Sequence, residues 1–249
     1  MISNSPITEF SNYPIRDCTA VVFDVDFTLI YPGPTFRGEG YQAFCARYGM
    51  AVDPARFDGA VASAAALLDG PEDATYHADI FVRYTSHIIE QMGGSGPDVN
   101  ACAREIYGEW AACHHFELYD DVPAVLRTLA EANVRVGLIS NSHRSLDSFQ
   151  SHFRLEGLIA ASVSSADYGF MKPHPSIFRE ALRLLEASPR EAVMVGDSVE
   201  QDVEGALRAG MRAVLVHRAA TRPPQSEALA SRGVPVISSL AELPPLVIG

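Results

Sequence analysis

Short apolar runs that lack polar alternation predict the buried strands of a parallel sheet. They cover residues 20–23, 134–139, 192–195 and 211–216, and such runs are typical of strands covered on both faces. Neighbouring segments carry apolar residues at helical spacing, over residues 122–132, 177–185 and 198–209, the last closing at Gly210. Strands that alternate with helices predict an α/β fold, with an open, doubly wound parallel sheet of the Rossmann-like kind.

Residues 34–116 do not alternate between strand and helix patterns, and they predict several helices in a row. The expected helices cover residues 39–48, 54–68, 76–92 and 98–114, separated by breakers at Gly49, at Gly70 and Pro71, and at residues 93–97. We therefore expect a catalytic α/β core formed by residues 1–33 and 117–249. A helical cap domain, residues 34–116, would be inserted between the first and second strands and lie above the sheet.

Composition and charge exclude several classes of partner. The chain is 47% hydrophobic and 20% charged, as is usual for a soluble globular protein. No apolar run approaches the ~20 residues of a membrane span, and the first residues lack the pattern of a secretory signal, so a cytoplasmic location is expected. The net charge of −12, with scattered basic residues, argues against binding to nucleic acid or to a membrane surface.

Polar residues follow three of the predicted strands. They are Asp24 and Asp26 after the first, Ser140 and Asn141 after the second, and Asp197 after the strand at 192–195. Because the carboxyl ends of parallel strands share one edge, folding should gather these side chains in one crevice. Carboxylates that converge would repel one another, and a divalent cation with a lysine would relieve that repulsion. Lys172 is the one lysine among 19 basic residues.

These residues resemble the four sequence motifs of the haloacid dehalogenase superfamily, in their usual order. The motifs are D-x-D-x-T at Asp24, Asp26 and Thr28, a strand-end serine at Ser140, Lys172 followed by Pro173, and G-D-x-x-x-x-D at Gly196, Asp197 and Asp202. The resemblance runs from about residue 20 to the VISSLAEL segment. Each motif is weak alone, but four in register are specific. The resemblance is to the phosphatase branch, with a helical cap between the first two motifs.

The resemblance implies a phosphomonoesterase that acts on a small phosphorylated metabolite. Asp24 would be the nucleophile that forms an aspartyl-phosphate intermediate. Asp26 would protonate the leaving oxygen and later activate the water. The phosphoryl group would be bound by Ser140, by the backbone amide of Asn141 and by Lys172.

The resemblance also implies a Mg²⁺ cofactor. Its ligands would be Asp24, the backbone carbonyl of Asp26 and Asp197, because Mg²⁺ prefers oxygen ligands. Asp202 would orient Lys172 or a metal-bound water, and Thr28 would support the turn that follows Asp26.

Two residues near the motifs invite a hypothesis about the substrate. Phe27 stands where most members of the superfamily have glycine, so its ring either walls the substrate cavity or packs beneath the cap. Arg144, just after Ser140 and Asn141, is a candidate to bind a second anionic group of the substrate.

Several alternatives stay open or are disfavoured. A sugar-phosphate mutase would share the site, and a non-enzymatic phosphate-binding scaffold would share the fold. A serine esterase with Ser198 as nucleophile would need a late D-x-x-H motif, which is missing. A dehalogenase would not need the second acid, Asp26. The substrate's identity and the choice between monomer and homodimer stay open.

Overall fold

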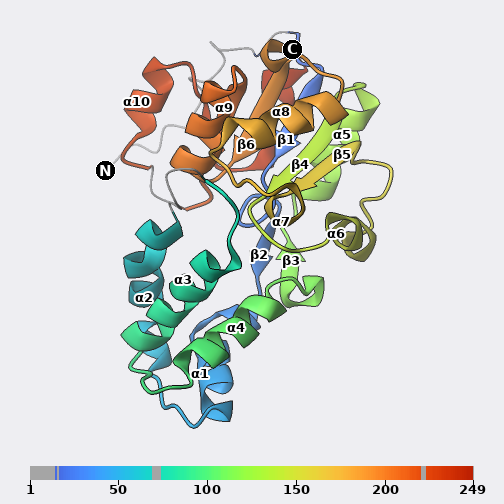
Figure 1. The fold of residues 1–249 in the computed structure, drawn as a ribbon. Helices are drawn as coiled ribbons and strands as arrows, with labels where there is room; N and C mark the ends of the chain where they lie inside the picture. Colours follow the sequence, from blue (N-terminus) through green and yellow to red (C-terminus); the bar gives the residue numbers. More distant parts are fainter. Residues whose placement is uncertain (1–14, 16, 69–73, 220–222, 249) are drawn as a thin grey trace, which may run out of the picture.

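The computed structural model describes residues 15, 17–68, 74–219 and 223–248. The expected helix break at Gly70 and Pro71 and the first 14 residues, on which the expectation about a secretory signal rested, lie outside the described residues. Figure 1 shows an α/β part, which holds the main sheet, and a group of helices to one side of it, joined by a pair of short strands.

Six strands of the described chain form one parallel sheet in the order β5-β4-β1-β6-β7-β8. Their bounds are β1 Ala20–Phe23, β4 Arg135–Ser140, β5 Ala161–Ser164, β6 Ala192–Gly196, β7 Arg212–Val216 and β8 Val236–Ile237. In the centre, Val21 of β1 lies opposite Val136 of β4 and Val193 of β6. Every residue of β1 and β6 is buried, which explains why these runs show no polar alternation. The predicted α/β fold is confirmed.

Helices cover both faces of this sheet (Figure 1). Side chains of β1 alternate between two apolar layers: Val21 and Phe23 enter one, Ala20 and Val22 the other. The first layer includes apolar residues of α5 (Val122–Glu131) and α6 (Leu146–Phe153). The second layer includes residues of α8 (Pro175–Leu184), α9 (Gly205–Arg208) and α10 (Ser226–Ser231). Two shorter helices, α7 (Ser165–Tyr168) and α11 (Pro244–Val247), complete this part.

The helix predicted over residues 198–209 is divided in the structure. It begins as a π-helix, Val199–Glu204, and continues as α9. The Ser198 side chain accepts a hydrogen bond from the backbone N–H of Gln201 and so caps its start. Gly210 ends it at φ +84°, in the left-handed region expected of a helix stop. The wide π-turn carries Asp202, one of the motif residues.

Between β2 and β3, helices α1 to α4 pack together below the main sheet (Figure 1). Their bounds are α1 Gly38–Arg47, α2 Phe57–Ala64, α3 Ala78–Gln91 and α4 Val99–Glu109. The helix expected over 54–68 has 3₁₀ turns at both ends, Pro54–Arg56 and Ala65–Leu68. The last helix ends before its expected limit, at Glu109, and Trp110 then packs against Phe36 and Phe116.

The strands β2 (Ile30–Pro32) and β3 (Phe116–Leu118) pair antiparallel and link the helical group to the sheet. Three-residue strands carry too little periodicity to be predicted from the pattern. None of the helices in the described part of the chain is long and apolar enough to cross a membrane.

Candidate active site

Lys172 lies between two carboxylates at the carboxyl edge of the sheet. Its Nζ donates to Asp24 Oδ1 at 2.5 Å and to Asp202 Oδ1 at 2.7 Å. Asp24 follows β1 directly, and the Lys172 side chain is only 1% exposed. A buried ammonium needs such partners to offset the loss of water. Folding therefore brings together three motif residues that lie far apart in the sequence.

A glycine at the end of β6 allows Asp202 to reach this position. A Cβ atom on Gly196 would lie 2.2 Å from the Asp202 carboxylate, a distance that no side chain tolerates. Asp202 Oδ2 also accepts a hydrogen bond from the backbone N–H of Ser198 at 3.0 Å. Asp202 thus holds both Lys172 and the loop that carries Asp197.

Asp24, Asp197 and Asp202 together could hold a cation. Each offers one carboxylate oxygen, and these oxygens lie within 4.8 Å of one another. Asp24 Oδ2 is buried and has no hydrogen-bond partner among the described residues. An orphaned carboxylate oxygen beside two further carboxylates fits a hard cation such as Mg²⁺. Two of these residues, Asp24 and Asp197, were predicted as Mg²⁺ ligands. The third, Asp202, was predicted to orient Lys172 or a metal-bound water. The remaining predicted ligand is the backbone carbonyl of Asp26.

The pKa shifts of the residues at this site also favour a bound cation. Burial raises the pKa of Asp24 to about 7, against the lowering effect of the Lys172 ammonium, and the charge of Asp202 adds to the rise. Desolvation and the neighbouring charges of Asp24 and Asp202 raise the pKa of Asp197 well above its ordinary value. Burial lowers the pKa of Lys172, but the Asp202 and Asp24 carboxylates outweigh it and raise that pKa above its usual range. The single positive charge of Lys172 does not balance the negative charges of the three carboxylates.

Arg144 forms an ion pair with Asp26 and is buried within the protein. Its Nη1 donates to Asp26 Oδ1 at 2.9 Å and to Oδ2 at 3.1 Å, and its Nη2 donates to the Trp110 carbonyl at 2.8 Å. The guanidinium lies over the Phe116 ring, and the side chain is fully buried. The hypothesis that Arg144 meets a second anionic group of the substrate is therefore wrong. A buried arginine needs a partner within the protein, and Asp26 supplies it.

Ser140 and Asn141 lie at the end of β4, as predicted. The Ser140 hydroxyl is buried, 2.9 Å from the Ser142 hydroxyl and 3.5 Å from Asp26 Oδ2. The Asn141 side chain joins loops: its Nδ2 donates to the Lys172 carbonyl and to Gln201 Oε1, and its Oδ1 accepts from the Lys172 backbone N–H.

Thr28 is fully buried in the turn after Asp26. Its hydroxyl has no hydrogen-bond partner in the described part of the chain, while its carbonyl accepts from Arg218 Nη2 at 2.9 Å. The backbone of Thr28, and not its hydroxyl, is what ties this turn to its surroundings.

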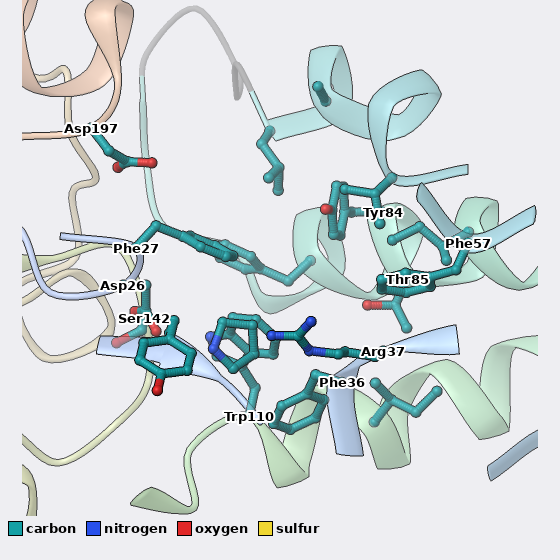
Figure 2. A pocket seen from close by; sticks show the side chains of 18 of the residues that line it. Asp26, Phe27, Phe36, Arg37, Phe57, Tyr84, Thr85, Trp110, Ser142 and Asp197 are labelled. Carbon is teal, nitrogen blue, oxygen red and sulfur yellow. The ribbon is translucent and has the colours of Figure 1, made fainter. Parts of the chain in front are cut away.

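A cavity of about 1310 Å³ opens between this edge of the sheet and the helical group. Figure 2 shows Asp26 and Asp197 at one side of it, and Tyr84 and Phe57 at the other. The ring of Phe27 lines the cavity and is 45% exposed, so it does not pack beneath the helices. Sequence reasoning missed Ser142 and Gln201, which also line it. Ser142 carries a usable signal, because it lies two residues after Ser140 at the same strand end.

Comparison with known proteins agrees with this geometry. The family model of haloacid dehalogenase-like hydrolases matches residues 18–210. The N-acylneuraminate-9-phosphatase of Mus musculus is 32% identical over 185 residues, which are 70% of each chain. The glyceraldehyde 3-phosphate phosphatase of Methanopyrus kandleri is 29% identical, over 80% of this chain and 84% of that one. The fold resembles the crystal structure of a HAD phosphatase from Thermococcus onnurineus, with a TM-score of 0.60 and 22% identity over 91% of this chain and 96% of that one. The chain therefore belongs to the haloacid dehalogenase-like hydrolases.

Proposed function

We propose that the protein is a Mg²⁺-dependent phosphomonoesterase that acts on a small phosphorylated metabolite through an aspartyl-phosphate on Asp24. The proposal rests mainly on the surroundings of the two Asp24 carboxylate oxygens. One oxygen is held by Lys172, and the other is unpartnered at the base of a large cavity. The phosphatase names of the relatives support the same reaction, since both name small phosphorylated compounds.

In the first step, one carboxylate oxygen of Asp24 attacks phosphorus and the bond from phosphorus to the alcohol oxygen breaks. Asp26 acts as the general acid: its carboxylate, which pairs with Arg144 in the structure, must take up a proton and then gives it to that leaving oxygen. In the second step, Asp26 takes a proton from water as the water oxygen attacks phosphorus. The bond from phosphorus to Asp24 then breaks, inorganic phosphate leaves and the carboxylate is restored.

The residues around Asp24 would bind the phosphoryl oxygens. Lys172 places a positive charge beside them, and Ser140 and the backbone amide of Asn141 would donate hydrogen bonds. Arg144 holds the Asp26 carboxylate in place, close to Ser140. A Mg²⁺ ion bound by Asp24, the carbonyl of Asp26 and Asp197, with Asp202 oriented towards Lys172, would neutralise charge on the phosphoryl group.

We further propose that residues 34–116 act as a cap on a core formed by residues 1–33 and 117–249. The cavity lies between the two, so a cap that closes over bound substrate would keep water from the first step. The expected setting is the cytoplasm, as a monomer or homodimer, without nucleic acid or membrane as partner.

The test uses the purified protein with 4-nitrophenyl phosphate. We expect release of nitrophenol and phosphate with Mg²⁺, none with EDTA, and recovery when Mg²⁺ is added back. Asp24→Asn should lose about 10³-fold or more of this activity, and a phosphorylated peptide that contains Asp24 should be detectable in the wild type. Activity that survives EDTA or Asp24→Asn would refute the proposal. Phosphate that relocates on a hexose phosphate without being released would instead identify a mutase.

A further inference from the structure

Phe27 has a backbone conformation that suits its side chain poorly. Its φ is +64°, in the left-handed region, which is unusual for a bulky residue. The turn imposes this conformation, because the Phe27 N–H donates to the Ile30 carbonyl, and the N–H groups of Leu29 and Ile30 donate to Val25. Glycine would adopt it without penalty.

The ring of Phe27 gains little from packing within the protein. It is 45% exposed, and its closest aromatic contact is with Trp110, at 6.4 Å between ring centroids and 42° between planes. The strained backbone lowers stability, and the exposed ring adds little burial energy to offset that loss. Such strain beside a reactive centre points to function. Phe27 follows Asp26 directly and lies three residues after Asp24.

The cavity that Phe27 enters is rich in aromatic side chains. Ten of the chain's Phe, Tyr and Trp residues line it: Phe27, Tyr31, Phe36, Tyr41, Phe57, Phe81, Tyr84, Tyr107, Trp110 and Tyr119. Among the described lining residues, Arg37 is the one arginine or lysine. In Figure 2, Phe27 extends from the side of Asp26 and Asp197 into the space that Trp110 and Tyr84 also line. Flat apolar groups bind such surfaces by offset stacking and edge contacts.

We propose that the substrate is a phosphate monoester whose alcohol portion carries a planar apolar ring, and that this ring packs on Phe27 while the phosphate lies at Asp24. The inference rests on the proposed phosphatase activity and adds the substrate's chemical class to it. Phe27 is then a specificity-determining residue, because its ring adjoins the position that the leaving alcohol takes beside Asp26. The ligand ring covers the exposed face of Phe27, which the protein itself leaves open.

The experiment compares 3-phenylpropyl phosphate with propyl phosphate. Both esters release a primary alcohol, so the ratio of their kcat/KM values reports binding of the ring and not leaving-group reactivity. In the wild type we expect a ratio of about 10 or more in favour of the phenyl compound, mostly through KM. In Phe27→Gly and Phe27→Leu the ratio should fall to within about twofold of unity, and in Phe27→Tyr it should persist.

The matched control is Arg154→Gly. Arg154 has φ +56° at the exposed end of α6, so the substitution relieves the same kind of backbone strain away from the cavity. Both glycine variants should raise the melting temperature, whereas Phe27→Leu should not, because leucine keeps the unfavourable φ. Phe27→Gly and Phe27→Leu should change the substrate ratio, and Arg154→Gly should not.

A wild-type ratio near one would overturn the assigned substrate class, and a ratio unchanged in Phe27→Gly would overturn the packing of the substrate ring on Phe27. Faster hydrolysis of glycerol phosphate than of 3-phenylpropyl phosphate would overturn the substrate class as well. In each of these cases Mg²⁺-dependent phosphate release would persist and the phosphatase proposal would stand. If no ester released phosphate, the phosphatase proposal would fail first and this inference with it.

Discussion

At the scale of single residues, Lys172 shows how one side chain organises its surroundings. Its ammonium donates to Asp24 and Asp202, and its backbone N–H and carbonyl both bond to the Asn141 side chain. The sequence marked this residue, because it is the one lysine in a chain otherwise rich in arginine. A compact, tetrahedral ammonium fits between two carboxylates where a planar guanidinium does not.

We expect Lys172→Arg to lower kcat/KM for an aryl phosphate by about 100-fold, because the wider fork displaces Asp24 from the position that Lys172 fixes. Steady-state kinetics with Mg²⁺ would measure the loss. Arg183→Lys is the matched control, since Arg183 is exposed and pairs with Glu180 on α8. Full activity in Lys172→Arg would show that only the charge, and not its shape, is needed.

Arg144 shows where reasoning from single residues fails. Its place after Ser140 and Asn141 suggested contact with substrate, but the structure buries it between Asp26, the Trp110 carbonyl and the Phe116 ring. Asp26 lies 118 residues and Trp110 lies 34 residues from Arg144 in the chain. Nothing in the local sequence of Arg144 carries that information, because burial depends on how distant segments pack.

At the scale of elements, the ends of the strands decide where chemistry can occur. Asp24 follows β1, Ser140 ends β4, and Gly196 ends β6, and β1 pairs in parallel with both neighbours. Apolar runs and the parallel arrangement were readable from the sequence, and so was this shared edge. The β2–β3 pair and the π-turn at Asp202 were not, since short or irregular elements lack a distinctive period.

The end of β6 offers a test at this scale. Gly196→Ala would place a Cβ atom against the Asp202 carboxylate, so we expect a loss of about 1–3 kcal/mol in unfolding free energy and at least a tenfold drop in kcat. Denaturant titration and kinetics would measure the two. Gly59→Ala, in helix α2 with open space around it, should be neutral or stabilising. Equal behaviour of the two variants would contradict the close approach at Gly196.

At the scale of the whole molecule, Asp121 and Arg218 tie four distant segments together. Arg218 donates to both Asp121 oxygens and to the Thr28 carbonyl, and Asp121 also accepts from Ser239 and Leu240. Burial raises the pKa of Asp121, but the hydrogen bonds from Arg218 and Ser239 outweigh it and leave that pKa below its ordinary value. The ionised form is therefore the one that stabilises the fold.

A depressed folded pKa means that this stabilisation is present above the ordinary value of 3.8 and is lost as the pH falls through the folded pKa below it. We expect Asp121→Asn to lower the unfolding free energy by about 1–3 kcal/mol at neutral pH. The difference from wild type should shrink below pH 3.8. Melting curves across this range would test it, with Asp120→Asn, an exposed neighbour, as control. A difference that does not depend on pH would refute the role of the charge.

Cation binding should also appear in the stability of the whole molecule. A ligand that binds only the folded state at a hundred times its Kd adds about 2.7 kcal/mol. We therefore expect Mg²⁺ to raise the melting temperature by several degrees, and Asp197→Asn to reduce that rise. If Mg²⁺ raised the melting temperature of wild type and Asp197→Asn equally, the cation would bind elsewhere.

The sequence by itself determined the α/β class, four of the six strands of the parallel sheet, the run of helices within residues 34–116, and the motif residues that meet at the sheet edge. It could do so because buried parallel strands leave continuous apolar runs, and because parallel pairing places their carboxyl ends together. Only the tertiary structure decided that Arg144 binds Asp26, that Asp202 reaches Lys172 past Gly196, and that Phe27 faces the cavity. These contacts join segments far apart in the chain, so they depend on packing that no local pattern encodes.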